Sequence, residues 1–166
     1  MPIIIVVIAL VFALLQSTII PASEIYGSYP DLVLAILLLI LFFDSKKLAG
    51  IYIISASIFI SIFSATGMVH IILPYFLIFL LYIFFSDRRL ISRPSVTFSF
   101  FIFALANLLK IFFQLVLVKN FNLGPDIILS SLLTAFAGII IYYFCRRIYF
   151  FLNPQILKER IKISHL

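Results

Sequence analysis

Charged residues are scarce in this chain of 166 residues. Asp, Glu, Lys and Arg together make up 11% of it, against roughly 25% in soluble domains. The hydrophobic share is 65%, whereas a soluble domain is about 45–50% apolar. A soluble fold of this size could not bury so much apolar surface, so lipid must cover the remainder. We therefore expect an integral membrane protein that lives in the lipid bilayer and has no separate polar domain.

Cysteine and histidine are too few for most catalytic or metal sites. The single cysteine, Cys145, cannot form an internal disulfide, and no Cys/His spacing suits a metal ion. His70 and His165 have no nucleophile, base or second ligand near them in the sequence. No glycine-rich phosphate loop, HExxH or paired-carboxylate motif occurs. We therefore expect no enzymatic activity, no cofactor and no metal.

The apolar runs predict an all-α bundle of six transmembrane helices. A spanning helix needs about 20 mostly apolar residues, and polar or proline-containing breaks separate such runs here. The second run is short, but Pro30 and Asp31 mark a clear helix start, because Pro disfavours helix before it and Asp caps free amides. We predict one membrane domain over 1–152 and a basic tail over 153–166, with spans over 3–20, 31–43, 48–64, 68–85, 96–118 and 127–145.

Lysine and arginine fall almost entirely on one face of such a bundle. Only Lys119 lies on the other face, and Lys110 lies within a span. Because cytoplasmic loops carry an excess of Lys and Arg, the basic face and both termini are expected to be cytoplasmic. The charges then report topology, and no nucleic-acid partner is expected. The basic face holds Lys46, Lys47, Arg88, Arg89, Arg93, Arg146, Arg147, Lys158, Arg160 and Lys162.

A polar stripe lies inside the predicted fifth span. Lys110 is roughly 12 Å along the helix from Val118, at a depth where a charge is costly. Asn107 and Gln114 share its helical face, at i−3 and i+4. Two interpretations stay open. Lys110 snorkels outward while the amides bond neighbouring helices, or the stripe lines a polar cavity or a partner site.

Possible partners for Lys110 lie on the same outer side. Asp31 and Asp126 each follow a proline at the start of a helix, and Gln16 ends the first span. Because opposite charges in a medium of low dielectric need close approach, we predict that Lys110 lies near Asp31 or Asp126. The candidate internal network or partner site is therefore Lys110, Asn107, Gln114, Asp31, Asp126 and Gln16.

Small residues recur along the third span. They share one helical face, where they would let two helix backbones approach closely. We predict a packing role for Gly50, Ser57, Ser61 and Ser64.

The chain resembles the bacterial rod shape-determining protein MreD family. The first span ends in Leu14-Leu15-Gln16-Ser17-Thr18, close to the usual ending in that family. A short loop then leads to Tyr29-Pro30-Asp31-Leu32-Val33-Leu34, which looks like its Pro-Asp-Leu segment. The third span begins near Leu48-Ala49-Gly50 and is followed by Ser64-Ala65-Thr66-Gly67, similar to a small-residue helix before a Ser/Gly turn. The second half is similar in hydropathy only, and serines replace the glycines and acidic residue usual in the third span of the family.

This resemblance implies a non-enzymatic scaffold in the bacterial inner membrane. Such proteins bind MreC within the cell-elongation machinery that organises peptidoglycan synthesis, and they are associated with MreB and with RodA and its penicillin-binding partner. The MreD fold is also similar to the substrate-binding S components of energy-coupling factor transporters. The alternative function is therefore a vitamin-uptake subunit, and a small-molecule ligand is expected only in that case.

Overall fold

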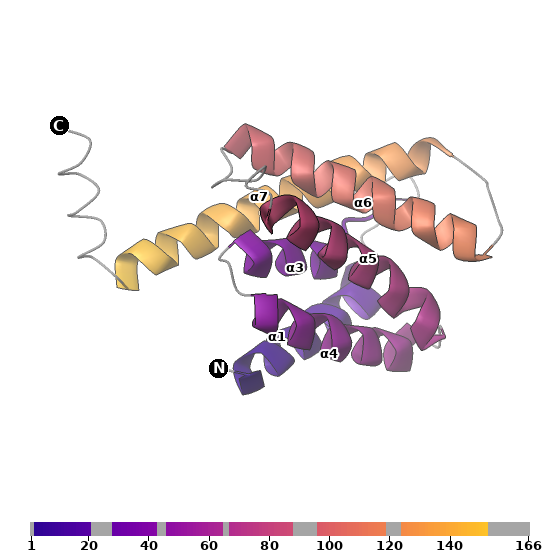
Figure 1. Cartoon of the computed structure of the whole chain (residues 1–166), viewed down its shortest axis with the longest axis horizontal. Coiled ribbons are helices and arrows are strands. Elements are labelled where there is room, and N and C mark those ends of the chain that lie inside the picture. The colour runs from indigo at the N-terminus through magenta and orange to yellow at the C-terminus, as the bar shows by residue number, and fades with distance from the viewer. Residues whose placement is uncertain are drawn as a thin grey trace.

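The described part of the chain is built from helices. The computed structural model describes residues 2–20, 28–42, 46–64, 67–87, 96–118 and 124–152, and no β-strand pairs within these ranges. The predicted tail over 153–166 lies outside the described residues, as do Lys119 and the arginines of the loop before residue 96. The elements, drawn in Figure 1, are α1 (Pro2–Leu14), a π-helical turn η1 (Leu15–Ile19), α3 (Leu32–Phe42), α4 (Lys46–Ser64), α5 (Met68–Asp87), α6 (Val96–Val118) and α7 (Pro125–Leu152).

Five of these helices are long and apolar enough to cross a membrane. The segments that meet this requirement are Pro2–Ile19, Lys46–Ser64, Met68–Phe85, Phe98–Leu117 and Pro125–Cys145. Only 17% to 33% of the most apolar stretch of each segment is buried within the protein, so apolar side chains remain on its outside for lipid to cover. The described residues are thus helical, as predicted, and five helices that could cross a membrane indicate a multi-pass membrane protein.

The predicted second span differs from the other five. α3 has 11 residues and is about 16 Å long, against about 30 Å for the hydrocarbon core of a bilayer. A helix of this length does not cross the bilayer by itself. The count of six spanning helices is therefore not confirmed.

α3 is the buried centre of the bundle. It is apolar on every side, and all of Val33–Leu39 is buried, together with Leu41. α3 packs against α7, α4, α6 and α1, which surround it in Figure 1. A helix that is hydrophobic all round is stable where protein or lipid covers every face. Here protein covers it, so α3 need not match the thickness of the membrane.

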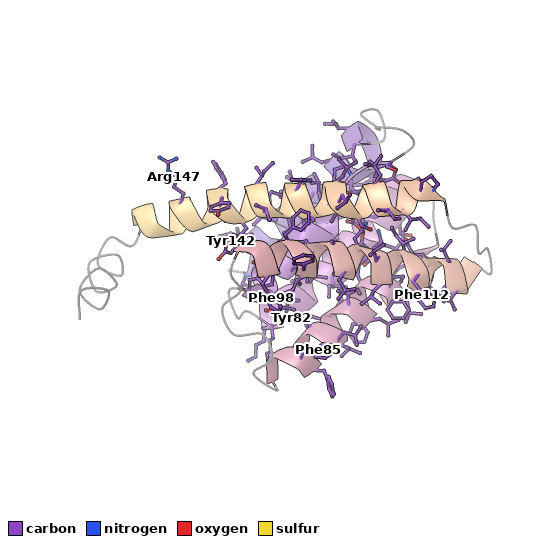
Figure 2. All side chains as sticks on the ribbon, turned by 90° about the horizontal axis from the view of Figure 1, so that it is seen from above. Tyr82, Phe85, Phe98, Phe112, Tyr142 and Arg147 are labelled. Carbon is purple, nitrogen blue, oxygen red and sulfur yellow. The ribbon has the colours of Figure 1, made fainter. Side chains whose placement is uncertain are left out.

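α7 is longer than the predicted span over 127–145. It runs without a break from Pro125 to Leu152, 28 residues or about 42 Å. No glycine or proline interrupts the sequence after Gly138 until Asn153-Pro154, and a residue before proline disfavours helix. The last turns, which carry Arg147, extend beyond the other helices in Figure 2.

The packing face of α4 differs from the predicted stripe. Of the four proposed residues only Ser57 lies on the buried face, and Ser64 is exposed and bonds to the Ile60 carbonyl at 2.7 Å. A Cβ added at Gly50 would meet no atom within 4 Å, so Gly50 marks no close approach. The predicted stripe consists of small residues, whereas the face that packs also includes large apolar ones: Ala49, Tyr52, Ile53, Ala56, Ser57 and Ile60.

The close approach between helices occurs instead at α6 and α7. A Cβ on Gly138 of α7 would lie 2.7–2.8 Å from three ring carbons of Phe103, which is fully buried on α6. Only a glycine leaves room for this ring, so Gly138 fixes how near the two helices lie. The sequence did not predict this contact, because Gly138 is a single glycine within an apolar run and forms no motif for close helix packing.

Candidate functional site: a polar centre at the start of α3

Asp31 begins α3. Its carboxylate oxygen Oδ1 accepts a hydrogen bond from the Leu34 amide at 2.8 Å, and its carbonyl accepts the first helical bond, from Ala35, at 3.1 Å. This is the helix-capping role that the sequence predicted for Asp31. The residue is only 3% exposed, so a carboxylate lies inside the protein, where it needs further partners.

Two side chains from other helices supply those partners. The Tyr75 hydroxyl on α5 donates to Asp31 Oδ1 at 3.2 Å and to Oδ2 at 3.0 Å. Lys110 Nζ on α6 forms an ion pair with Asp31 Oδ2, and it lies 5.1 Å from the centre of the Tyr75 ring, which favours a cation. The side chains of Lys110 and Asp31 are 13% and 4% exposed. The structure thus pairs Lys110 with Asp31, one of the two carboxylates proposed from the sequence, and Lys110 does not snorkel outward.

The backbone before α3 is tied to two further elements. Gln16 in η1 accepts a hydrogen bond from the Leu32 amide at 2.8 Å and donates to the Pro30 carbonyl at 3.2 Å. Thr134 on α7 accepts from the Asp31 amide at 2.8 Å. Backbone that is neither helix nor sheet is tolerated at membrane depth only when protein groups satisfy it. These bonds therefore allow α3 to start inside the bundle.

Asn107 on α6 is held by two serines of α7. Its Nδ2 donates to Ser130 Oγ and to Ser131 Oγ, both at 3.3 Å. Ser130 Oγ donates in turn to the Tyr29 carbonyl at 2.9 Å, and Ser131 Oγ to the Ile127 carbonyl at 2.9 Å. Because both serine protons are used, the amide must turn its nitrogen to the serines. Its Oδ1 is then left buried and without a hydrogen-bond partner among the described residues.

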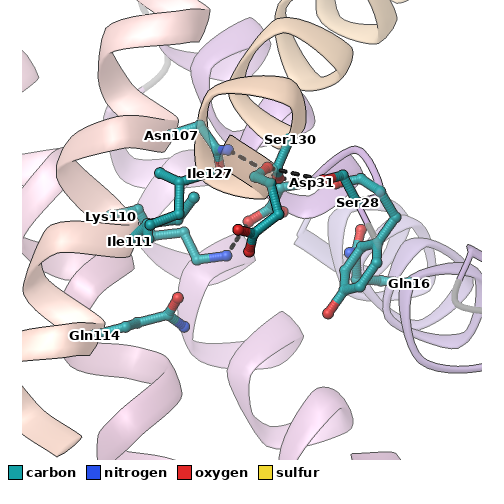
Figure 3. Close-up of a pocket in the computed structure, with 11 residues that line it drawn as sticks. Gln16, Ser28, Asp31, Asn107, Lys110, Ile111, Gln114, Ile127 and Ser130 are labelled. Carbon is teal, nitrogen blue, oxygen red and sulfur yellow. Dashed lines mark hydrogen bonds and ion pairs between the residues drawn. The ribbon is translucent and has the colours of Figure 1, made fainter. Parts of the chain in front are cut away.

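These side chains surround a polar cavity of about 210 Å³, drawn in Figure 3. It lies where α6 ends, α7 begins and the chain enters α3. All six residues proposed from the sequence as a network line it, although Asp126 is exposed and contributes its carbonyl, which accepts from Ser28 at 2.8 Å. The lining residues are Gln16, Ser28, Tyr29, Asp31, Asn107, Lys110, Ile111, Gln114, Asp126, Ile127 and Ser130.

Sequence reasoning missed Tyr75 on α5 and the hydroxyl-bearing side chains of α7. Ser130, Ser131 and Thr134 form a polar group at helical spacing within an apolar run, a signal that could have been used. Tyr75 gave no comparable signal, because a tyrosine in an apolar span is equally typical of the membrane interface.

The site has no metal-binding geometry. No group of three or more His, Cys, Asp or Glu side chains gathers anywhere in the described ranges. His70 is exposed near the start of α5, and His165 lies outside the described residues. Among the described residues, the site contains one internal ion pair and a set of hydrogen-bonding amides and hydroxyls.

Comparison with known proteins finds no match to this chain among protein-family models, curated proteins or solved structures. Its function has to be inferred from its own residues.

Proposed function

We propose that this chain is a non-enzymatic scaffold of the bacterial inner membrane that binds an MreC-like single-span protein. It would act in the cell-elongation machinery that organises peptidoglycan synthesis, together with MreB and with RodA and its penicillin-binding partner. The proposal starts from the resemblance to MreD proteins. The observation that carries it is a direct connection between the two segments in which this resemblance is strongest.

Those segments, Leu14–Thr18 and Tyr29–Leu34, are joined through Gln16. The Gln16 amide bonds to the Pro30 carbonyl and to the Leu32 amide, so one motif positions the other. The resemblance thus involves residues that cooperate in the fold, rather than two short apolar matches. No relative adds support, so the proposal depends on these residues.

A six-crossing topology with cytoplasmic termini is part of the proposal. Residues 28–31 and α3 would together carry the chain back across the membrane, as a crossing enclosed by the other helices. The burial of α3 and the hydrogen bonds that the Leu32 and Asp31 amides donate to Gln16 and Thr134 support this. Ten of the twelve basic residues then share one face, as the positive-inside rule favours.

The polar cavity favours one second candidate, a substrate-binding subunit similar to energy-coupling factor S components. Such a subunit needs a pocket for its ligand, and pockets for drug-sized molecules measure about 300–1,000 Å³. The cavity of about 210 Å³ is smaller, and its one buried charge pair is already internally neutralised. Both facts favour the scaffold.

Co-purification tests the proposal. The chain is expressed in a bacterial membrane with the MreC-like single-span protein of the same genome and purified through a tag on the partner. An unrelated single-span protein of equal length serves as the control. We expect recovery of this chain with the MreC-like protein alone, and no small molecule in mass spectra of the purified complex. Recovery no better than with the control contradicts the scaffold, and a tightly retained vitamin supports the second candidate.

A further inference from the structure

The lipid-facing side of α7 ends in an exposed arginine. Large apolar side chains recur along this helix every four residues, and the rest of the protein leaves them open to lipid. Arg147 lies three residues beyond the last of them, is exposed, and points away from the bundle in Figure 2. It therefore continues the face that meets lipid. The apolar residues of this face are Ile128, Leu132, Phe136, Ile140 and Phe144.

The lipid-facing side of α4 begins with an exposed lysine. Lys47 lies in the first turn of this helix, and the exposed Ile54 follows two helical turns later. Ile58 and Ile62 continue the same face at helical spacing and are exposed as well. Two separate helices thus combine an apolar face for acyl chains with a basic side chain at one end of that face.

The two basic side chains lie at the same end of the bundle. Phe42 ends α3, and α4 begins at Lys46, shortly after it. The rings of Phe42 and Tyr142 on α7 are in contact, with their centroids 6.2 Å apart. Arg147 follows Tyr142 by about 7.5 Å of helix. Lys47 and Arg147 therefore border the same leaflet of a bilayer.

Both side chains lie at the edge of the hydrocarbon without a protein counter-charge. The membrane-crossing stretch of α7 ends at Cys145 after 21 residues, or about 31 Å, which matches the roughly 30 Å of a bilayer core. Arg147 is thus at the depth of the lipid phosphates, and Lys47 borders α4 in the same way. Neither residue forms an ion pair with a carboxylate in the part of the chain that the structure describes.

We propose that Lys47 and Arg147 bind the phosphate groups of anionic phospholipids, whose acyl chains lie along the apolar faces of α4 and α7. Ammonium and guanidinium groups donate charge-assisted hydrogen bonds to phosphate oxygens. An anionic headgroup is favoured over a zwitterionic one, because the latter carries a cation that both side chains repel. The occupant is a lipid rather than a free phosphate, because each basic residue continues a lipid-facing apolar face. This binding goes beyond the proposed scaffold and does not depend on it.

Tryptophan fluorescence tests these sites, because the chain has no tryptophan of its own. Ile140→Trp places one indole two helical turns from Arg147, and Ile54→Trp places one at the same separation from Lys47. Ile128→Trp is the matched reference at the opposite end of α7, since Ile128 is 63% exposed and Ile140 69%.

Local lipid composition is the quantity that the tryptophans report. The full chain is reconstituted into bilayers that mix phosphatidylglycerol and phosphatidylcholine, with the acyl chains of one lipid or the other brominated. Quenching by each brominated lipid gives the ratio of the two lipids beside the indole, relative to their ratio in the bilayer.

The anionic lipid is expected to be enriched about fivefold at positions 140 and 54, the effect of one basic side chain near a membrane surface. No enrichment is expected at position 128, because the exposed Asp126 lies close to it and repels anionic headgroups. The proposal is overturned if position 140 or position 54 shows no more enrichment than position 128.

Removal of one charge at a time assigns the binding to the two residues. Arg147→Gln should reduce the enrichment at position 140 at least about twofold and leave position 54 unchanged, and Lys47→Gln should do the reverse. Arg147→Lys keeps the charge and should keep the enrichment. Enrichment that survives the glutamine variant near its own tryptophan overturns the proposal, because other charges would then attract the lipid. Circular dichroism of each variant checks that the helices are intact.

Discussion

At the scale of the residue, Asp31 is the point where most of the polar contacts meet. It caps α3, pairs with Lys110, accepts from Tyr75 and donates its amide to Thr134. Its local role could be predicted, because a proline-aspartate pair before an apolar run is a helix start. Tyr75 and Thr134 could not be assigned to it, because they lie 44 and 103 residues away in sequence and only the fold brings them near.

Substitution of Asp31 by Asn should be strongly destabilising. The variant leaves the Lys110 ammonium buried without a carboxylate, which costs about 3–5 kcal/mol when one partner of a buried pair is removed. Unfolding by sodium dodecyl sulfate in mixed micelles, followed by circular dichroism, measures the loss. Asp126→Asn, at an exposed position, is the control and should change stability by less than about 0.5 kcal/mol.

The double variant Asp31→Asn with Lys110→Met completes this test. It removes both charges, so it should be more stable than Asp31→Asn alone, by roughly the cost of the uncompensated ammonium. Additive losses from the two single changes would show that the two side chains do not interact.

Two glycines in helices should respond oppositely to alanine. Gly138→Ala places a Cβ against the buried Phe103 ring and should destabilise the protein by about 1–3 kcal/mol, as overpacking does. Gly50→Ala meets open space and should stabilise it by roughly 0.5–1 kcal/mol, since alanine favours helix. The same unfolding titration measures both. A neutral Gly138→Ala would mean that α6 and α7 lie further apart than described.

At the scale of the element, α3 differs most from the others. Hydropathy predicted its existence, and Pro30 and Asp31 predicted its start. Hydropathy could not show that protein rather than lipid covers the helix, because both surroundings favour the same apolar residues. The predicted packing face of α4 illustrates the same limit. Spacing alone did not separate Gly50 and Ser61 from the residues that pack, Ala49 and Ala56.

Gln16 is predicted to fix the entry into α3. Gln16→Leu removes the partners of the Leu32 amide and the Pro30 carbonyl inside the bundle, which should cost about 1–3 kcal/mol. Thr18→Val, two residues away, removes only a bond to the Leu14 carbonyl on an exposed side and should cost little. Equal losses in the unfolding titration would contradict this role for Gln16.

At the scale of the whole molecule, the described fold is a short, buried helix packed against four longer ones, α1, α4, α6 and α7. The helical class and the long helices followed from composition and run length, because hydrocarbon forces backbone groups to pair within each segment. The arrangement of helices around α3 could not be predicted from composition and run length, because it depends on side chains from four elements that meet at one place. The central claim is that 28–31 and α3 together return the chain across the membrane.

Cysteine labelling in the full-length protein tests this claim most directly. Lys47→Cys and Asn120→Cys are made separately in the Cys145→Ser background and treated, in intact cells, with a maleimide that does not cross the membrane. Truncated fusions are unsuitable, because α3 depends on α6 and α7 for its polar partners. The account predicts labelling at position 120 only, with position 47 labelled after the cells are opened. Labelling of position 47 in intact cells would contradict it.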